Sequence, residues 1–234
     1  MQTNSNSYTI MYAAIMTIIV AVLLAGLTTG LKPMQSKNYT LDKKMTILQA
    51  VDKGITKEQA ETAYNSYITE VVVDGEGKEQ SGVQAFDLDL KKQYAEAPAN
   101  QRLPLYIYKK DGKELYIVPM VGNGLWDAIG GYVALEKDMS TIEGTVFTHV
   151  GETPGLGAEI TTDWFQKQFL GKKIMDGNNF QSVHVIKGKS PDTPNNPHQV
   201  DGITGATITG NGVDAMLKNV LAKYLPYFKS KSRV

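Results

Sequence analysis

Hydrophobic residues are concentrated near the N-terminus, where residues 8–27 form an almost wholly apolar run. Residues 1–31 contain no Asp, Glu, Lys or Arg. A helix needs roughly 20 apolar residues to cross a bilayer, so this pattern predicts a single transmembrane helix that contacts lipid over residues 8–31. A cleaved signal peptide is the alternative, but its usual charged leading region is missing and the run is too long. We therefore expect residues 1–35 to be a retained membrane anchor.

Helical spacing follows the anchor over residues 39–67. Asp42 is predicted to cap a first helix that ends at residue 50, and Thr-Lys-Glu-Gln at residues 56–59 reads as the capping box of a second. Residues 81–102 are polar, which predicts a connection containing one helix. We assign residues 36–100 to a helical or mixed N-terminal part of a soluble domain.

Alternating apolar positions predict strands further along the chain. Residues 104–108 and 114–118 alternate on either side of Asp111-Gly112, which is a strong hairpin signal. Residues 70–74, 132–135 and 145–150 are also predicted to be strands. Because the strands follow one another without a helix between each pair, they indicate a mostly antiparallel sheet. The predicted fold class is α+β, a transmembrane helix followed by an antiparallel-sheet domain with flanking helices.

The C-terminal part mixes helix and loop signals. Residues 162–170 are predicted to be a helix that buries four apolar side chains, Trp164, Phe165, Phe169 and Leu170. Residues 190–197 contain three prolines, which lack the backbone donor of a strand and so predict a loop. A last helix is expected from residue 213. Residues 101–228 form the second part of the domain, and residues 229–234 are predicted to be a disordered basic tail.

Composition excludes several functions for the 234-residue chain. Lys plus Arg and Asp plus Glu balance at 24 each, so no overall field attracts nucleic acid. There is no cysteine, which excludes disulfides, thiolate metal sites and cysteine-held iron–sulfur clusters. His149, His184 and His198 lack metal-ligand spacing, so we predict no metal. Asp127 replaces the third glycine of a dinucleotide fingerprint, so we predict no NADH site, and no catalytic residue is assigned.

Residues 201–212 are the most distinctive stretch, with four Gly and three Thr in twelve residues ahead of the last helix. Glycines let the backbone approach a bulky group, and amides at a helix N-terminus bind phosphate. The segment therefore predicts a loop that receives a phosphorylated ligand, through hydroxyls that could bond to it or attach it. A Gly/Thr-rich turn that simply caps the last helix is the alternative. Spacing alone does not choose among Thr204, Thr207 and Thr209 as the acceptor.

Three motifs resemble one family. Asp-Gly-Ile-Thr-Gly-Ala-Thr at residues 201–207 resembles the motif on which a flavin transferase attaches FMN. His-Val-Gly-Glu-Thr-Pro-Gly-Leu-Gly at residues 149–157 resembles the flavin-facing loop of the same family, and residues 122–132 supply a third match. With the membrane span, these motifs make the chain similar, over nearly its whole length, to the C subunit of sodium-translocating NADH:quinone oxidoreductases.

The resemblance implies site residues. Thr207 would carry FMN through a phosphoester, and Asp201 would present the loop or bind the metal of the transferase. The residues implied to contact the cofactor are Thr204, Gly205 and Ala206 beside the acceptor, and Glu152, Thr153, Leu156 and Gly157 along the ring. An ordinary turn is the alternative for residues 151–157. Trp126 is a candidate for ring contact, although a tryptophan beside glycines is more often a core or interface anchor.

The resemblance also implies partners and location. Electrons from NADH would pass through other cofactors to this flavin, then to the flavin of the B subunit and to quinone. The B, D and E subunits are the implied partners, and a flavin transferase matures the chain. The chain would be a single-pass protein of the bacterial cytoplasmic (inner) membrane with its domain on the extracytoplasmic, periplasmic side. Lys32, Lys37, Lys43 and Lys44 follow the span, however, and by themselves favour the cytoplasmic side.

Two alternatives stay open. The G subunit of the ion-translocating ferredoxin:NAD oxidoreductase is similar in its anchor, flavin loop and glycine-rich segment, although the Gly-Leu-Trp stretch at residues 124–126 favours the quinone reductase. The other alternative is an anchored, non-catalytic module that binds a phosphorylated ligand reversibly. Retention of yellow colour after denaturation would distinguish a covalent flavin from such a module.

Overall fold

The structure is a computed structural model that describes residues 5–231, and contacts divide the chain into two units after Lys43. Most of helix α1 (Asn6–Gln49) belongs to the first unit. Among the described residues, α1 is the helix long and apolar enough to cross a membrane, with a mean hydropathy of 2.6 in its most apolar window. The predicted N-terminal helix is therefore confirmed. The predicted cap at Asp42 is wrong, because Asp42 lies within the continuous helix α1.

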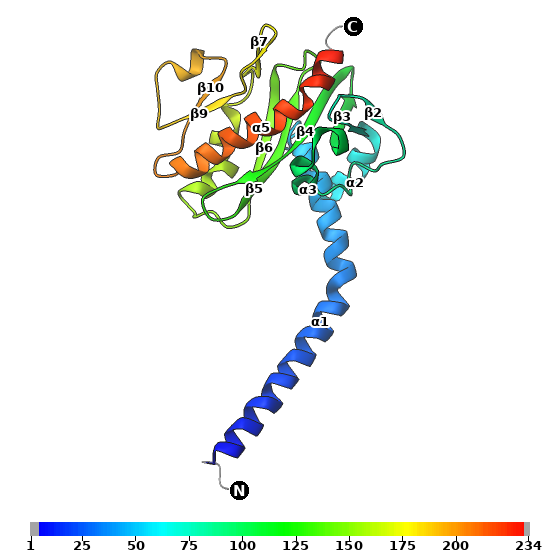
Figure 1. Ribbon diagram of the computed structural model, residues 1–234, viewed down its shortest axis with the longest axis vertical. Helices are drawn as coiled ribbons and strands as arrows, with labels where there is room; N and C mark the ends of the chain where they lie inside the picture. Colours follow the sequence, from blue (N-terminus) through cyan, green and yellow to red (C-terminus); the bar gives the residue numbers. More distant parts are fainter. Residues whose placement is uncertain (1–4, 232–234) are drawn as a thin grey trace. The chain divides into compact units, whose positions relative to one another are not determined.

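The second unit contains the sheet and the remaining helices (Figure 1). Its first half comprises α2 (Lys57–Tyr67), β1 (Ile68–Val73), β2 (Glu79–Gln80), α3 (Leu90–Ala95), the 3-10 turn η1 (Pro98–Asn100), β3 (Leu103–Lys110), β4 (Lys113–Asn123), β5 (Ala128–Leu135) and β6 (Ile142–His149). Its second half comprises η2 (Gly157–Thr161), α4 (Asp163–Lys167), β7 (Met175–Asp176), β8 (Asn179–Phe180), β9 (His184–Ile186), η3 (Thr193–Asn195), β10 (Gln199–Asp201) and α5 (Thr207–Lys231).

Six strands form one antiparallel sheet in the order β2-β1-β3-β4-β5-β6. The β3–β4 hairpin turns at Asp111 and Gly112, which both have positive φ, of 52° and 78°. Two successive positive φ values are the conformation of a type I′ turn, which fits the twist of the flanking strands. The hairpin and the antiparallel sheet predicted from the sequence are confirmed.

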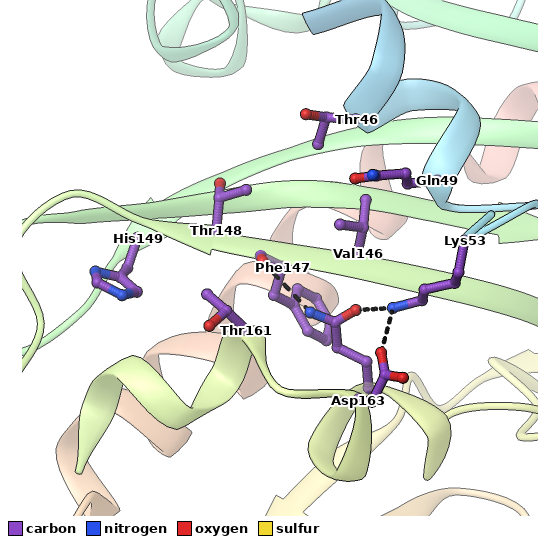
Figure 2. Close-up of a pocket in the computed structure, with 10 residues that line it drawn as sticks. Thr46, Gln49, Lys53, Val146, Phe147, Thr148, His149, Thr161 and Asp163 are labelled. Atoms are coloured by element: carbon purple, nitrogen blue, oxygen red, sulfur yellow. Dashed lines mark hydrogen bonds and ion pairs between the residues drawn. The ribbon is translucent and has the colours of Figure 1, made fainter. Parts of the chain in front are cut away.

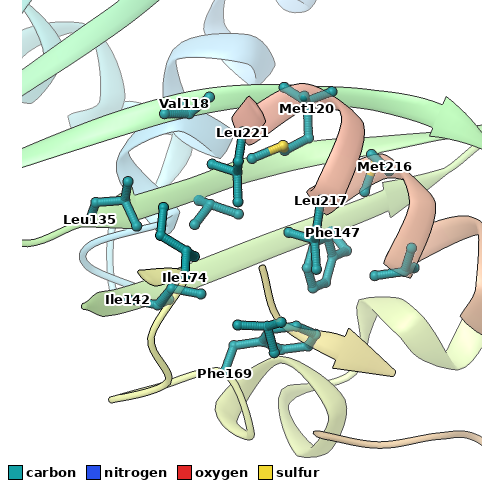
Figure 3. Close-up of a cluster of buried hydrophobic side chains, with 14 of the residues drawn as sticks. Val118, Met120, Leu135, Ile142, Phe147, Phe169, Ile174, Met216, Leu217 and Leu221 are labelled. Atoms are coloured by element: carbon teal, nitrogen blue, oxygen red, sulfur yellow. The ribbon is translucent and has the colours of Figure 1, made fainter. Parts of the chain in front are cut away.

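Helix α5 lies across one face of the sheet, as Figure 1 shows. Successive side chains of a strand point to opposite faces, so β4 directs Val118 and Met120 toward α5 and Ile117 toward the other face. Figure 3 shows the core between the sheet and α5, where Leu217 and Leu221 meet the strands. A second core on the other face includes side chains of α2 and the end of α1. The sheet is thus covered on both faces, and the start of α5 is held at one end of the larger core.

Some local predictions hold and others do not. Thr56 and Gln59 form the predicted capping box at the start of α2. The predicted helix over residues 162–170 is shorter, because α4 ends at Lys167, and two of the side chains expected to be buried, Trp164 and Leu170, are exposed. Helix α5 continues to Lys231, so the prediction of disorder is wrong for residues 229–231. The rest of the predicted tail lies outside the described residues.

Candidate functional site

A tight turn brings the predicted acceptor segment to the surface. Strand β10 pairs in parallel with β9, and the chain then turns over residues 203–206, where the Ala206 amide donates to the Ile203 carbonyl at 3.1 Å. Gly205 occupies the third position of this turn with a φ of 79°, which favours glycine there. The turn delivers Thr207 to the first position of α5, where its side chain is exposed.

The helix start is suited to an anionic group. The first intrahelical bond runs from the Gly210 amide to the Ala206 carbonyl at 2.9 Å, so residues 207–209 contribute the amides of the first turn. Such amides, together with the helix dipole, favour a phosphate. Of the three threonines in the segment, Thr204 and Thr207 are exposed, whereas Thr209 is 1 % exposed. The structure therefore reduces the accessible hydroxyls from three to two.

Glu152 joins the acceptor helix to two loops. Its Oε2 accepts a hydrogen bond from the Thr209 hydroxyl at 2.5 Å, and its Oε1 accepts one from the Trp126 amide at 2.9 Å. The Glu152 side chain is 4 % exposed. One buried carboxylate therefore connects the predicted flavin-facing loop, the β4–β5 loop and the first turn of α5. We call these three residues, Glu152, Trp126 and Thr209, the Glu152 junction.

The Glu152 junction keeps its carboxylate ionised. Burial of Glu152 opposes ionisation, but hydrogen bonds from the Thr209 hydroxyl and from backbone amides of residues 125–127 outweigh that effect and hold the pKa of the carboxyl below its ordinary value. A buried charge is tolerated when it is fully hydrogen-bonded. Glu152 is therefore a negative charge fixed inside the chain near the N-terminus of α5.

Glycines make the close approach of these segments possible. A Cβ on Gly157 would lie 2.3 Å from Glu152 Oε2 and 2.5 Å from Thr209 Oγ1, and one on Gly124 would lie 2.5 Å from Glu152 Oε1. A Cβ on Gly205 would lie 2.7 Å from the Leu156 side chain, so the loop over residues 151–157 also contacts the acceptor turn directly. Contacts this short exclude any side chain larger than hydrogen unless the neighbours move.

Asp201 and Lys172 fix the proline-rich loop that precedes the acceptor turn. The Asp201 carboxylate accepts from the Ser190 amide at 3.1 Å. The buried Lys172 ammonium donates to the carbonyl oxygens of Thr193 and Asn196, both at 2.7 Å. Burial lowers the pKa of Lys172, and the charge of Asp201 opposes that shift. In this structure the Asp201 carboxylate therefore holds the start of the proline-rich loop.

Exposed apolar side chains surround the Glu152 junction. The Trp126 indole is 69 % exposed although its backbone is held by Glu152, so this tryptophan is not a core anchor. The exposed apolar residues on the three joined segments are Leu125, Trp126, Val150, Leu156 and Ile208. Sequence reasoning missed Leu125, Val150 and Ile208. The available signal was a large apolar residue inside or next to a glycine-rich stretch, where burial in a core is not expected.

A cavity of about 540 Å³ lies along β6, and Thr207 is not among the residues that line it (Figure 2). Lys53 extends across it to the Gln166 amide oxygen and lies 3.7 Å from Asp163. His149 lines this cavity and is also the first residue of the predicted flavin-facing loop. Its Nδ1 accepts a hydrogen bond from the Glu152 amide at 3.3 Å. Thr207 instead borders a narrow crevice between residues 185–188 and 202–211. The predicted acceptor is thus a surface position rather than the lining of a deep pocket.

Comparisons with known proteins show which family the chain resembles. The FMN-binding domain family matches residues 124–222. The C subunit of the Na(+)-translocating NADH-quinone reductase of Pseudomonas aeruginosa is 32 % identical over 94 % of this chain and 92 % of its own length. The corresponding subunit of Neisseria meningitidis serogroup B is 33 % identical over 96 % of this chain and 93 % of its own length.

Two solved structures are similar to the fold. The crystal structure of the C subunit of the Na(+)-translocating NADH-quinone reductase from Parabacteroides distasonis has a TM-score of 0.77 and 38 % identity, and the match covers 85 % of this chain and 96 % of that one. Shewanella oneidensis NqrC has a TM-score of 0.68 and 26 % identity, with 85 % and 100 % covered.

Proposed function

The chain belongs to the NqrC family, the C subunits of the Na(+)-translocating NADH-quinone reductase, and on this basis we propose that it carries one FMN covalently on Thr207 and relays electrons within that complex. It is a subunit of the reductase with an FMN-binding domain, and membership of a multi-subunit complex implies further subunits as partners. In the proposed relay, electrons leave this chain toward the flavin of the B subunit and then quinone, with the D and E subunits as further contacts.

The exposure of Thr207 at the start of α5 is the observation that carries the proposal. Attachment requires a donor in which FMN is joined to a second nucleotide through a diphosphate bridge. The Thr207 oxygen attacks the phosphorus on the FMN side and forms the new O–P bond as the hydroxyl proton leaves. The P–O bond of the bridge breaks, and the second nucleotide departs as a monophosphate that keeps the bridging oxygen. A transferase must reach the hydroxyl for this step. Thr207 meets that requirement, whereas Thr209 donates its hydroxyl to Glu152 and is buried.

The surrounding residues fit an FMN group. Amides of the first turn of α5 are suited to the phosphate, and Thr204, Gly205 and Ala206 form the turn beside it. The exposed apolar side chains of Leu156 and Trp126 offer contact to a planar ring. We propose that Thr153 and Gly157 keep the loop over residues 151–157 in place for that contact. Bound FMN supplies the one- and two-electron redox chemistry, and the protein supplies its position.

Peptide mass mapping tests the attachment. The full chain is purified from cells that also express a flavin transferase, with Thr207→Ala and Thr204→Ala alongside. We expect the wild type and Thr204→Ala to carry the mass of FMN minus water on residue 207 and to fluoresce in a denaturing gel, and Thr207→Ala to lack both. Thr204 is the matched control because it is also an exposed threonine and lies in the turn just before Thr207. An unmodified wild type, with the transferase active on another substrate, would leave reversible binding of a phosphorylated ligand as the function.

We further propose that the second unit faces the extracytoplasmic side of the bacterial inner membrane. The chain has no cysteine, so single cysteines can be labelled without background. Ser81→Cys lies in an exposed loop of the second unit and Ser7→Cys lies at the start of α1. In intact spheroplasts, a membrane-impermeant maleimide should label Ser81→Cys and leave Ser7→Cys unlabelled until the membrane is broken. The reverse pattern would place the unit in the cytoplasm, as the lysines after the span favour.

A further inference from the structure

The start of α5 lacks a local side-chain cap. The Ala206 carbonyl accepts the first intrahelical bond, so Ala206 occupies the N-cap position. Alanine has no side-chain acceptor for the amides of the first turn, and it is a poor N-cap residue. The turn that presents Thr207 must therefore be fixed in another way.

The Glu152 carboxylate, from a loop distant in the sequence, holds the turn that presents Thr207. Thr209 lies in the same turn as Thr207, and its hydroxyl donates to Glu152 Oε2, which is 57 residues away in the sequence. The other Glu152 oxygen is bound to the Trp126 amide. A negative charge near a helix N-terminus also interacts favourably with the helix dipole. One side chain thus ties the first turn of α5 to the β4–β5 loop.

We propose that Glu152 is a positioning residue that sets the orientation of the first turn of α5 and thereby the presentation of Thr207 to the enzyme that modifies it. This inference rests on the proposed attachment of FMN to Thr207. Glu152 acts through Thr209 and makes no contact with the reacting atoms. Both of its oxygens accept hydrogen bonds within the chain, and Glu152 is buried, so its contacts in this structure are with the first turn of α5 and the β4–β5 loop.

The packing around the carboxylate leaves little room for another arrangement. A Cβ on Gly157 or on Gly124 would lie within 2.5 Å of a Glu152 oxygen, so both loops press against it. A hydrogen bond to an ionised group is about twice as strong as a neutral one. Neutralising Glu152 or deleting the Thr209 hydroxyl should therefore loosen the first turn of α5 without emptying the core below it.

The first measurement uses no flavin. Hydrogen exchange of the full chain in detergent micelles is followed over residues 210–212, whose amides are the first to bond within α5, in a Thr207→Ala background, with and without a second substitution. We expect Glu152→Gln and Thr209→Val to speed exchange of these amides about tenfold, as expected when one charge-assisted bond is lost. Thr209→Ser keeps the hydroxyl and should restore slow exchange. Glu159→Gln is the matched control, because Glu159 lies in the same region and its carboxylate accepts from an exposed amide, that of Gly155.

The second measurement is the rate of flavin attachment with Thr207 intact. Glu152→Gln and Thr209→Val should lower kcat/KM of the transferase for this chain about tenfold, while Thr209→Ser and Glu159→Gln stay near the wild type. The inference is overturned if both variants exchange and react as the wild type does. An unmodified wild type would refute the attachment at Thr207 instead, and the exchange data would still decide whether Glu152 fixes the turn. If Thr209→Val does not fold, Glu152→Gln and the Thr209→Ser rescue keep the comparison decisive.

Discussion

Gly157→Ala is the sharpest test of how tightly the Glu152 junction is packed. The added Cβ would lie 2.3 Å from Glu152 Oε2, 2.5 Å from Thr209 Oγ1 and 3.2 Å from Glu152 Cβ. The two closest atoms are the acceptor and the donor of one hydrogen bond. Gly157 has no positive φ, so alanine is not penalised there for a left-handed backbone, and the effect on the folded state comes from the crowded carboxylate and hydroxyl.

The magnitude follows from two effects. Overpacking a close-packed site costs about 1–3 kcal/mol, and losing a hydrogen bond to a charged group costs about 1.5–3 kcal/mol. If the Glu152 carboxylate moves away, the overpacking is relieved but the hydrogen bond to Thr209 is weakened. The two costs therefore do not add fully. Replacing glycine also restricts the unfolded chain, which offsets about 0.4–1 kcal/mol. We expect Gly157→Ala to lower the free energy of unfolding by about 2–3 kcal/mol.

The assay is urea unfolding of the full chain in detergent, followed by circular dichroism. Gly151→Ala is the matched control, because it lies in the same loop, has no positive φ and would place its Cβ at an ordinary 3.6 Å from Asp127. We expect the control to stay within about 0.5 kcal/mol of the wild type. If Gly157→Ala is as stable as Gly151→Ala, the junction accommodates a methyl group and our account of its rigidity is wrong.

Three further changes have defined outcomes. Tyr224→Phe removes a fully buried hydroxyl that donates to the Pro104 carbonyl at 2.7 Å and should cost about 1–3 kcal/mol in urea unfolding, whereas Tyr39→Phe at an exposed position should have no effect. Lys172→Met leaves the Thr193 and Asn196 carbonyls without their charged donor. Limited proteolysis within residues 190–198 should become about tenfold faster, and an unchanged cleavage rate would contradict this. Glu152 has a folded-state pKa below its unfolded value, so its stabilisation is present above about pH 4.5 and is lost as pH falls through the folded pKa. The difference in unfolding free energy between the wild type and Glu152→Gln should shrink from about pH 6 to about pH 3, and a constant difference would refute this.

Local signals in the sequence predicted the elements that depend on neighbouring residues. Asp111-Gly112 set the turn of the β3–β4 hairpin because both positions need positive φ. Thr56 and Gln59 set the start of α2 through bonds that span three residues. The charge-free run at the N-terminus predicted α1 from length and apolar composition alone. The motif at residues 201–207 likewise singled out Thr207 by resemblance, and its modification stays a prediction.

Signals that depend on packing failed. The apolar spacing of residues 162–170 predicted one buried face on a helix of that length, but α4 ends at Lys167. Phe165 and Phe169 are buried as expected, whereas Trp164 and Leu170 are exposed. Lys189 lies 5.4 Å from the centre of the Trp164 ring, a contact that the local pattern does not contain. Asp42 is a good cap residue by type, yet α1 runs without interruption from Asn6 through Pro33 and Asp42 to Gln49, so no helix begins there.

The sequence by itself determined the long apolar helix α1, the antiparallel sheet and the short list of hydroxyls that could accept a phosphate. The tertiary structure alone decided which of them are accessible, since it buries Thr209 and exposes Thr204 and Thr207. It also decided that Glu152 bonds to the first turn of α5 and to the β4–β5 loop. The physical reason is that helix and turn signals act over about four residues, whereas the Glu152–Thr209 bond joins positions 57 residues apart and leaves no periodic pattern in the chain.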